Sequence, residues 1–571
     1  MVERTHSIEQ NRPWVKWVVL FIFLAALAWF TRYWFSSGFG LYEDDLTYIP
    51  TAMEASFGEI IEQIAAQLST LGHQGRPLMW SWVILFGHLG WHLGGLHGMY
   101  LITYTIWLLN IILFVLLLRR INPSFMFSLV GGLAYVLFSA DTNQAFLFNA
   151  FGLQTAITFL LIALHIYLCD RKTRWLSYLF LIFVIINYET PFWLFLAAPL
   201  LTEVKDKPLK KQFIINTALM AVIFLAVYFL RYLSGESRVA ELSLQEMIVI
   251  PIKHMAIGPA VSLGIYFLRP ILVIRNLTTG LAVAGTASAL GIFGTLYWAY
   301  QQEKPSFVSV FPLKGGWWDR LGPQVQREIR LLFAGLIMLP FAYPLTIILR
   351  ATAISGRETR VHLAGVVGAA LVAASVTMLL LRALTSKGLR LVLLGLISLI
   401  FGLNFAFGFV IQKAYVRAWE LQKQFWRELI PLISDSVDGT AILVEPSGIE
   451  DVLYINANTW VLPRMLERFY IFPEEWELVP AVFRLAKFWE ENIVRVPGYF
   501  TLDGTNSFAH LVTFGDYEQE LAIFVTTSGG IVERQSTLTF MDEVIPVKPV
   551  GPDIFSTLET TLLFDLMVRE E

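Results

Sequence analysis

The sequence has little charge and a single cysteine. Only 15% of its 571 residues are Asp, Glu, Lys or Arg, whereas soluble proteins carry about 25%. A soluble enzyme of this size would need more charge on its surface, so the composition excludes one. Cys169 is the lone cysteine, which excludes a disulfide framework and any cluster of cysteine ligands around a metal.

Apolar side chains are abundant instead. Hydrophobic residues make up 56% of the sequence, aromatic residues make up 14%, and the mean hydropathy is +0.60. This profile excludes a disordered protein, a fibrous protein and a protein that coats nucleic acid. The apolar residues are gathered in long runs, which predicts a multi-spanning membrane protein.

Eleven apolar segments predict membrane-spanning helices, each of which needs about 20 residues. The first segment ends in TRYWF without a small-residue cleavage site, so we expect a span rather than a signal peptide. We therefore expect an all-α membrane protein of about eleven transmembrane helices, of which 175–188 and 191–203 are either two short spans or one hairpin. The segments are 14–35, 97–118, 124–140, 153–169, 175–188, 191–203, 212–232, 277–300, 330–349, 361–381 and 391–411.

Charge divides the chain into two parts. Residues 1–412 carry 30 Lys/Arg and 20 Asp/Glu, a net charge of +10, whereas residues 413–571 carry 12 and 25, a net charge of −13. We place a domain boundary here: a membrane domain, 1–412, precedes an acidic domain, 413–571.

Lysine and arginine in the short loops predict the orientation of the spans. With the N-terminus in the cytoplasm, cytoplasmic loops hold about 20 of these residues and the opposite loops hold roughly 9, which follows the positive-inside rule. Eleven spans then place residues 413–571 outside. We expect a multi-pass protein of the plasma (inner) membrane with an extracytoplasmic C-terminal domain.

Two apolar stretches fit this count poorly. Residues 77–94 are interrupted by His, Trp and Gly, and residues 247–275 contain Pro251 and Pro259. Counting either one alone as a span would reverse the later loops, so we expect both to be helices on the outer membrane surface. Alternatively, both stretches span together, which preserves the final orientation.

The C-terminal part predicts a mixed α/β domain. Residues 413–435 have the pattern of an amphipathic helix, and GTAILVEP (439–446) places a turn before a strand. RMLERFY and FRLAKFWEENIV favour helices, and the alternating segment around SGG (528–530) favours a hairpin. The domain lacks a nucleophile elbow, a phosphate loop and a metal pattern, so we expect it to bind an acceptor or a partner.

Three acids stand together in the first outer loop, residues 36–96. Glu43, Asp44 and Asp45 lie close to the first span, where ionised groups are costly and tend to be functional. Adjacent carboxylates repel one another, which raises the pKa of at least one and suits it to act as a base. The same pattern also suits a helix N-terminus, where Asp45 caps the residues that follow.

HQGRPLMW follows in the same loop. Arg76 is the only Lys or Arg of the loop, and it either neutralises a phosphate or pairs with Glu59 or Glu62. Pro77 suits the first position of a helix. We take His73 and Arg76 as candidates for binding substrate.

Further polar residues are expected on this side of the membrane. One such residue alone is more simply explained by solvation at the membrane edge, but acids and bases recur here. A carboxylate between apolar runs, as in NYETPFW, also needs a partner. The candidates are Asp141, Asn143, Gln144, Glu189, Arg357 and Arg360.

Three histidines are candidate metal ligands. The spacing of His88 and His92 places both on one helix face, and His97 follows. Zinc would need further ligands, and the surrounding Gly and Trp residues favour packing. We therefore expect no metal site here.

The order of these features resembles the GT-C superfamily of polyprenyl-phosphate-sugar-dependent glycosyltransferases, in particular protein O-mannosyltransferases and aminoarabinose transferase-like bacterial enzymes. The likeness rests on EDD, on GRPL before a helix ending in LFG, on spans ending in LLLRR and FSA, on YETPFWL, and on an arginine before a small-residue-rich span. It covers mainly residues 14–203, and more weakly the chain to residue 411. DTNQAFLFNAF lacks the basic residue of mannosyltransferases, which leaves the acceptor class open.

The resemblance implies an inverting transfer of a sugar from a polyprenyl phosphate to an acceptor on the outer face. Asp44 or Asp45 would be the general base, and Glu43 would orient the base or the acceptor. The resemblance implies that other residues bind the leaving phosphate and the sugar, and that Glu189 orders either an arginine or the sugar. These substrate-binding candidates are Arg76, Glu189, Arg357 and Arg360, with His73 beside them.

The resemblance also implies the partners. They are a lipid-linked sugar donor, membrane lipids and a protein, lipid or glycan acceptor, with no nucleic acid. No cofactor is required, because arginine neutralises a single phosphate, although some members use an acid-bound divalent cation such as Mg²⁺ or Mn²⁺.

Other function classes fit the sequence less well than a transferase. A transporter or flippase favours internal repeats and acids within spans, and the sequence has neither. A polysaccharide polymerase or ligase of the cell envelope would typically place its key residues in a large late loop. A scaffolding subunit would not need EDD at the outer surface.

Overall fold

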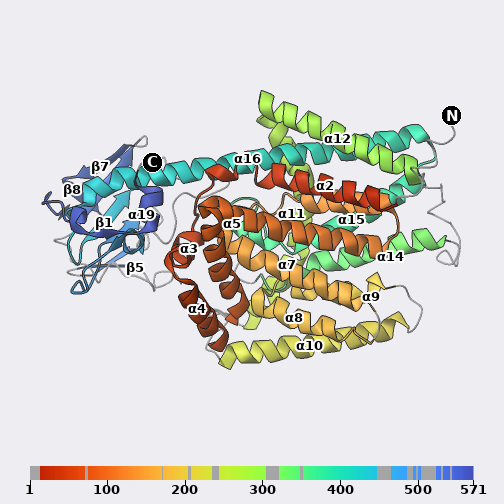
Figure 1. Ribbon diagram of the computed structural model, residues 1–571, viewed down its shortest axis with the longest axis horizontal. Coiled ribbons are helices and arrows are strands. Elements are labelled where there is room, and N and C mark those ends of the chain that lie inside the picture. The colour runs from red at the N-terminus through yellow and green to blue at the C-terminus, as the bar shows by residue number, and fades with distance from the viewer. Residues whose placement is uncertain are drawn as a thin grey trace.

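The computed structural model shows a helical bundle followed by a smaller C-terminal domain. Figure 1 shows the long helices running along the bundle, with the N-terminus at one end and the smaller domain at the other. We call the end that faces this domain the domain end. The expected fold class is confirmed: a multi-spanning helical protein with a C-terminal α/β domain. The structure describes residues 13–569 except 71–74, 170–171, 203–207, 234–243, 304–320, 347–350, 446–463, 485–492, 497–498, 503–522, 529–530 and 541–542.

In the described part of the chain, eight helices are long and apolar enough to cross a membrane, and three shorter apolar helices join them. The total equals the expected eleven, but it includes α11 and leaves out α14 (Pro323–Phe341), whose first residues, PQVQREIR, are polar. The eight are α2 (Pro13–Arg32), α5 (Pro77–Ile121), α7 (Leu147–Tyr167), α10 (Leu209–Leu233), α11 (Leu244–Arg275), α12 (Thr279–Glu303), α15 (Gly365–Ala383) and α16 (Lys387–Ile433). The shorter ones are α6 (Phe125–Val136), α8 (Leu176–Asn187) and η3 with α9 (Phe192–Leu201).

The contacts of α11 run across the bundle rather than along it. The His254 ring lies 3.0 Å from the Thr346 hydroxyl, just beyond the end of α14. Three turns later, Tyr266 donates to the carbonyl of Ala134 near the end of α6. Because α6 and α14 both end at the domain end, α11 lies across that end, as a helix on the membrane surface would. The position of residues 247–275 on that surface stays a prediction.

A sharp bend divides α5. Gly95 has φ 62° and ψ −143°, a conformation that glycine adopts without strain. The bend brings Gly98 against Gly90, so closely that a Cβ on Gly98 would lie 2.2 Å from the Gly90 carbonyl oxygen. The first part of α5 is thus set apart from the apolar span that follows it.

Short helices cover the domain end. The first part of α5 packs against α3 (Asp44–Glu54) and α4 (Phe57–Ser69), which lie across this end in Figure 1. Ser56 and Glu59 form a capping box that starts α4. The 3-10 helix η5 (Arg357–His362) lies at the same end.

One continuous helix joins the two parts of the molecule. α16 has 47 residues and is therefore about 70 Å long, and Figure 1 shows it leaving the bundle and entering the C-terminal domain. The predicted boundary after residue 412 falls inside this helix. Beyond it, Asp435 pairs with Arg534 at 2.6 Å and Lys548 at 2.8 Å, and it accepts a hydrogen bond from the backbone of Gly551.

The C-terminal domain is built on a mixed sheet in the order β3-β1-β6-β7. β1 confirms the predicted strand, and the antiparallel pair β6–β7 confirms the predicted hairpin. The helix expected for FRLAKFWEENIV is wrong at both ends, which form β3 and β4, because its first residues pair with buried β1; its centre lies outside the described residues. The elements are β1 (Ala441–Glu445), α17 (Leu466–Phe469), β2 (Tyr470–Ile471), β3 (Ala481–Arg484), β4 (Ile493–Val496), β5 (Tyr499–Leu502), β6 (Ile523–Ser528), β7 (Ile531–Gln535), β8 (Thr537–Phe540), β9 (Glu543–Pro546), η10 (Phe555–Thr557), β10 (Glu559–Thr560) and α19 (Leu562–Met567).

Candidate active site at the domain end

Asp45, the last residue of the EDD sequence, holds the start of α7 in place. It is fully buried, and both of its carboxylate oxygens accept hydrogen bonds. The donors are the backbone N–H groups of Leu147 at 3.0 Å, Phe148 at 2.7 Å and Tyr42 at 3.3 Å. Leu147 and Phe148 are the first residues of α7, so Asp45 caps α7 rather than its own helix. Burial raises the pKa of Asp45 to about 8, although the three donors act in the opposite direction.

Glu43 and Asp44 pair with arginines of η5. Arg357 bridges them, with its Nε 3.1 Å from Glu43 and its Nη1 3.1 Å from Asp44. Arg360 Nη1 lies 3.8 Å from the other oxygen of Asp44. The Asp44 side chain is 12% exposed, whereas Asp45 is fully enclosed.

Glu43 combines an unusual backbone with a shifted pKa. Its φ is 48°, and it is the one non-glycine residue with positive φ in the described ranges. Such a conformation costs about 1–3 kcal/mol and persists where the surroundings enforce it. Burial raises the pKa of Glu43 to about 7, although the charge of Arg357 lowers it. This carboxyl group therefore titrates close to neutral pH.

A second charged group gathers around Glu189. Arg76 donates two hydrogen bonds to its carboxylate, one of them from Nε at 3.0 Å, and its guanidinium lies 4.6 Å from the ring centre of Tyr188. Arg231 Nη2 approaches the same carboxylate at 3.4 Å. Burial alone would raise the pKa of Glu189, but the two arginines lower it to about 2. The predicted pairing of Arg76 with Glu59 or Glu62 is replaced by this pair.

Arg360 joins the two charged groups into one site. Burial lowers its pKa, the charges of Arg357 and Arg76 act in the same direction, and Tyr188 and Asp44 oppose them. All four are therefore close enough to Arg360 to shift its titration. Its Nε is buried and has no hydrogen-bond partner among the described residues, and it can donate to an oxygen of a substrate.

The loop between α6 and α7 positions this site. The Thr359 hydroxyl, between the two arginines of η5, accepts hydrogen bonds from the Thr142 backbone at 3.1 Å and the Asn143 side chain at 2.8 Å. Tyr415 of α16 donates to the carbonyl of Thr142 at 2.5 Å. Asp141 turns back to accept from Asn143. Asn143 therefore supports η5, and Asp141 supports Asn143.

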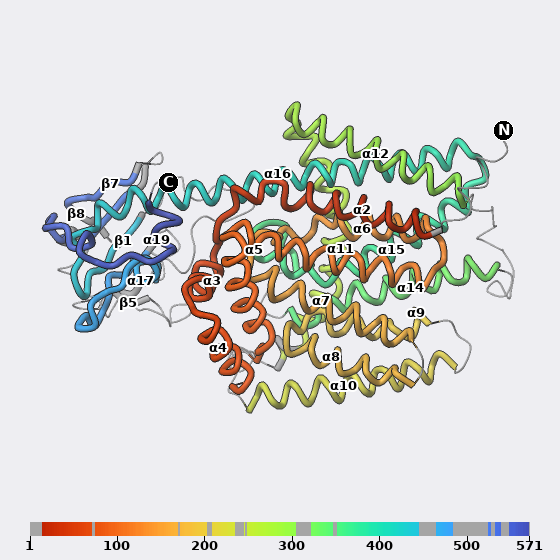
Figure 2. Tube along the Cα trace, viewed as in Figure 1, coloured from red at the N-terminus to blue at the C-terminus, as the bar shows by residue number. Residues whose placement is uncertain are grey.

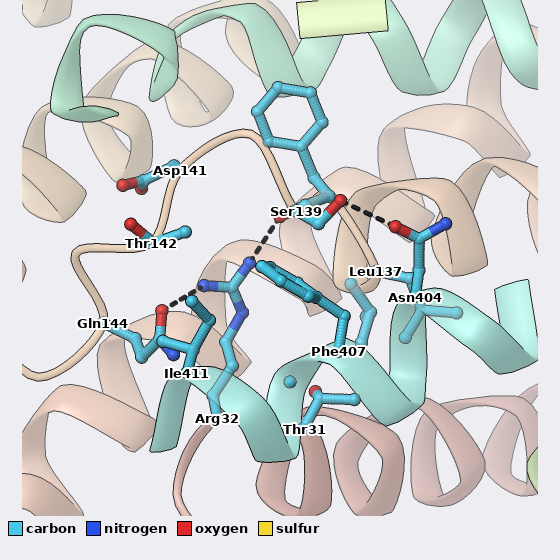
Figure 3. Close-up of a pocket in the computed structure, with 13 residues that line it drawn as sticks. Thr31, Arg32, Leu137, Ser139, Asp141, Thr142, Gln144, Asn404, Phe407 and Ile411 are labelled. Atoms are coloured by element: carbon cyan, nitrogen blue, oxygen red, sulfur yellow. Dashed lines mark hydrogen bonds between the residues drawn. The ribbon is translucent and has the colours of Figure 1, made fainter. Parts of the chain in front are cut away.

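Arg32 holds the same loop from inside the bundle. Figure 3 shows its guanidinium in a pocket between this loop and α16, where it donates to the carbonyl of Phe138 at 2.9 Å and to Gln144 at 3.5 Å. The guanidinium also lies 3.9 Å from the ring centre of Trp107. The pocket has a volume of about 30 Å³, which is room for roughly two water molecules. We regard it as part of the support of the loop.

The remaining predicted residues do not join the site. His73 lies outside the described residues. His88 packs under α3 with its Nδ1 3.3 Å from the Ala52 carbonyl, and its ring is 4.3 Å from that of His92. No group of three or more His, Cys, Asp or Glu in the described ranges is arranged to hold a metal ion. Glu43, Asp44 and Glu189 already pair with arginine. Asp45 accepts backbone hydrogen bonds with both oxygens, so these carboxylates do not fit a divalent cation.

Sequence reasoning missed two members of the site. Arg231, which is not among the predicted candidates, shares Glu189 with Arg76. Thr359 was passed over, although it ties η5 to the loop after α6. Arg231 stands just where an apolar helix ends, which is a usable signal for a charge at the membrane edge. Thr359 carries no such signal, because its role depends on a contact far along the chain.

Comparisons with known proteins give one similar structure. No protein-family model and no curated protein matches this chain. Among solved structures, the chain is similar to ArnT from Cupriavidus metallidurans in the apo state, with 16% identity and a TM-score of 0.32. The match covers 76% of this chain and 82% of that chain.

Proposed function

We propose that this protein is an inverting glycosyltransferase that moves a sugar from a polyprenyl phosphate to an acceptor at the outer membrane surface. The observation that carries the proposal is the position of Asp44, a carboxylate held between Arg357 and Arg360. A base next to cations that can hold an anionic leaving group suits this reaction.

Asp44 is the general base in this proposal. It takes the proton of an acceptor hydroxyl or amine as that group attacks the anomeric carbon. The bond between this carbon and the phosphate oxygen breaks, and its electron pair leaves with polyprenyl phosphate. Asp45 is less suited to this role because both of its oxygens already accept backbone hydrogen bonds.

The arginines hold the leaving phosphate. Arg360 donates through its unpaired Nε, and Arg357 and Arg76 add positive charge, while Glu189 keeps Arg76 in place. Charge-assisted hydrogen bonds of this kind strengthen as the leaving oxygen gains charge. A metal ion has no step in this scheme.

The membrane body fits the donor. A polyprenyl chain stays in the bilayer, so its phosphate reaches only a site at the membrane surface. Every described residue of the proposed site lies at the domain end, opposite the N-terminus (Figure 1). With the N-terminus in the cytoplasm, as the loop charges predict, the reaction takes place outside the cytoplasm of an inner membrane.

Release of the lipid product tests the proposal. Purified protein in lipid nanodiscs is mixed with labelled polyprenyl-phosphate sugars and membrane extract, and free polyprenyl phosphate is measured. We expect Asp44→Asn to lower release by at least about 100-fold, the effect of removing a general base. Glu62→Gln, which changes an exposed acid of α4, is the matched control and should leave release unchanged.

Two results would contradict the assignment. Full release by folded Asp44→Asn would remove Asp44 as the base. Absence of release by the unchanged protein with every lipid-linked sugar would remove the reaction class. Asp45→Asn is expected to lower the folded yield first, because it removes acceptors for the start of α7.

A further inference from the structure

The C-terminal domain contacts the helix that carries the proposed base. Arg468 Nη1 donates to the Thr51 hydroxyl of α3 at 3.3 Å, and the backbone N–H of Leu562 donates to Glu54 at 3.1 Å. Figure 2 shows α17 and α19 on the side of the domain that faces α3. The domain is therefore docked on the C-terminal end of α3, the helix that begins at Asp44.

One face of α3 connects the base to this contact. Asp44, Tyr48 and Thr51 follow the spacing i, i+4 and i+7, which places them on the same side of the helix. The rise along a helix separates the first from the last by about 10 Å. Asp44 meets the arginines of η5 at one end of this face, and Arg468 meets the other end.

Arg468 of the C-terminal domain has a donor available for a ligand, because its Nε is buried and has no hydrogen-bond partner among the described residues. The charges of Arg468 and Arg464 also reach the Tyr48 hydroxyl. Burial raises the pKa of Tyr48 to about 12, and both arginines act in the opposite direction. An anion here would receive charge-assisted hydrogen bonds.

We propose that Arg464 and Arg468 form a second anion-binding subsite, which holds a phosphate or carboxylate of the acceptor about 10 Å from the group that receives the sugar. The acceptor is thus an anionic molecule gripped between the two parts of the chain, with its reacting group at Asp44. This inference rests on the proposed function, because it assigns the acceptor of that reaction. It also gives the C-terminal domain a role in choosing substrates.

Three small probes test the subsite. Methyl glucoside, methyl glucoside 6-phosphate and methyl glucuronide are titrated by calorimetry into the full-length protein in phosphatidylcholine nanodiscs. We expect both anionic probes to bind about tenfold more tightly than the neutral one. A preference for the phosphate alone or the carboxylate alone supports the subsite and names the group.

Matched variants locate the binding. Arg468→Gln and Arg464→Gln should each remove the preference, whereas Arg569→Gln, which changes an exposed arginine of the same domain, should keep it. Thr51→Val breaks the docking hydrogen bond but keeps the guanidinium, so it should also keep the preference. Loss of the preference in Thr51→Val would show a docking role for Arg468 and overturn the proposal.

Two further results would also overturn the subsite. They are equal binding of all three probes by the unchanged protein, and a preference that survives Arg468→Gln. Release of polyprenyl phosphate is measured on the same preparations. Release without any anion preference leaves the transferase standing and removes only the subsite, whereas a preference without release removes the transferase.

Discussion

At the scale of single residues, three neighbouring acids have three different environments. Asp45 accepts hydrogen bonds from the backbone at the start of α7, Asp44 pairs with two arginines, and Glu43 has a strained backbone conformation. Their adjacency in the sequence predicts a functional cluster, but it cannot divide the roles. That division depends on α7 and η5, which are distant in the chain.

Glu43 should give the reaction a dependence on pH. Its pKa is raised to about 7, so it is neutral below this pH and charged above it. When Glu43 is charged, it offsets part of the positive charge of Arg357. The Asp44 carboxylate then binds a proton more strongly, which makes it a better base. We expect kcat/KM to rise as the pH passes 7, and Glu43→Gln to lack this step. A step that persists in Glu43→Gln would assign it to another group.

At the scale of elements, the sequence predicts what local pattern controls. Apolar runs located the spans, and the turn before a β-branched run located β1. The pattern failed where tertiary contacts decide: FRLAKFWEENIV has helical spacing, but its ends are drawn into β3 and β4. RMLERFY forms only the four-residue helix α17 before β2. The same limit applies to the site. The sequence predicts most of its charged residues, but it does not predict which of them pair, because the pairs join distant parts of the chain.

The bend in α5 offers a test at this scale. Gly98→Ala places a Cβ 2.2 Å from the carbonyl oxygen of Gly90, which is backbone and cannot turn aside. We expect a loss of about 1–3 kcal/mol in the free energy of unfolding, measured by thermal unfolding in detergent. Gly94→Ala is the control, because nothing lies within 4 Å of its Cβ position. Equal melting temperatures for the two variants would mean that the bend is not tightly packed.

At the scale of the whole molecule, α16 and Asp435 join the bundle to the C-terminal domain. The Asp435 side chain is 3% exposed and holds Arg534, Lys548 and the backbone of Gly551. No linker of flexible composition separates the two parts, although their charges differ strongly. The acidic domain is thereby fixed over a site rich in arginine.

Asp435→Asn should loosen this junction. Breaking one side of a buried ion pair costs about 3–5 kcal/mol, so we expect earlier unfolding of the C-terminal domain in calorimetry. Burial would raise the pKa of Asp435, but its partners lower it to about 2, below the usual value near 3.8. The stabilisation is therefore complete above that value and is lost as the pH falls from about 4 to 2. An unfolding transition of Asp435→Asn identical to that of the unchanged protein would contradict this.

The unbroken helix α16 also acts as a mechanical lever. Trp419 still packs against Tyr42 of the bundle, so about 14 residues at the end of α16 project beyond it, roughly 20 Å of helix. A change of 5° in the tilt of the last span would therefore move the far end by about 2 Å, and spans tilt when bilayer thickness changes. A displacement of this size would stretch the hydrogen bonds by which the C-terminal domain contacts α3, so a thicker or thinner bilayer would weaken those contacts. Lipid chain length becomes a variable that sets the geometry of the site.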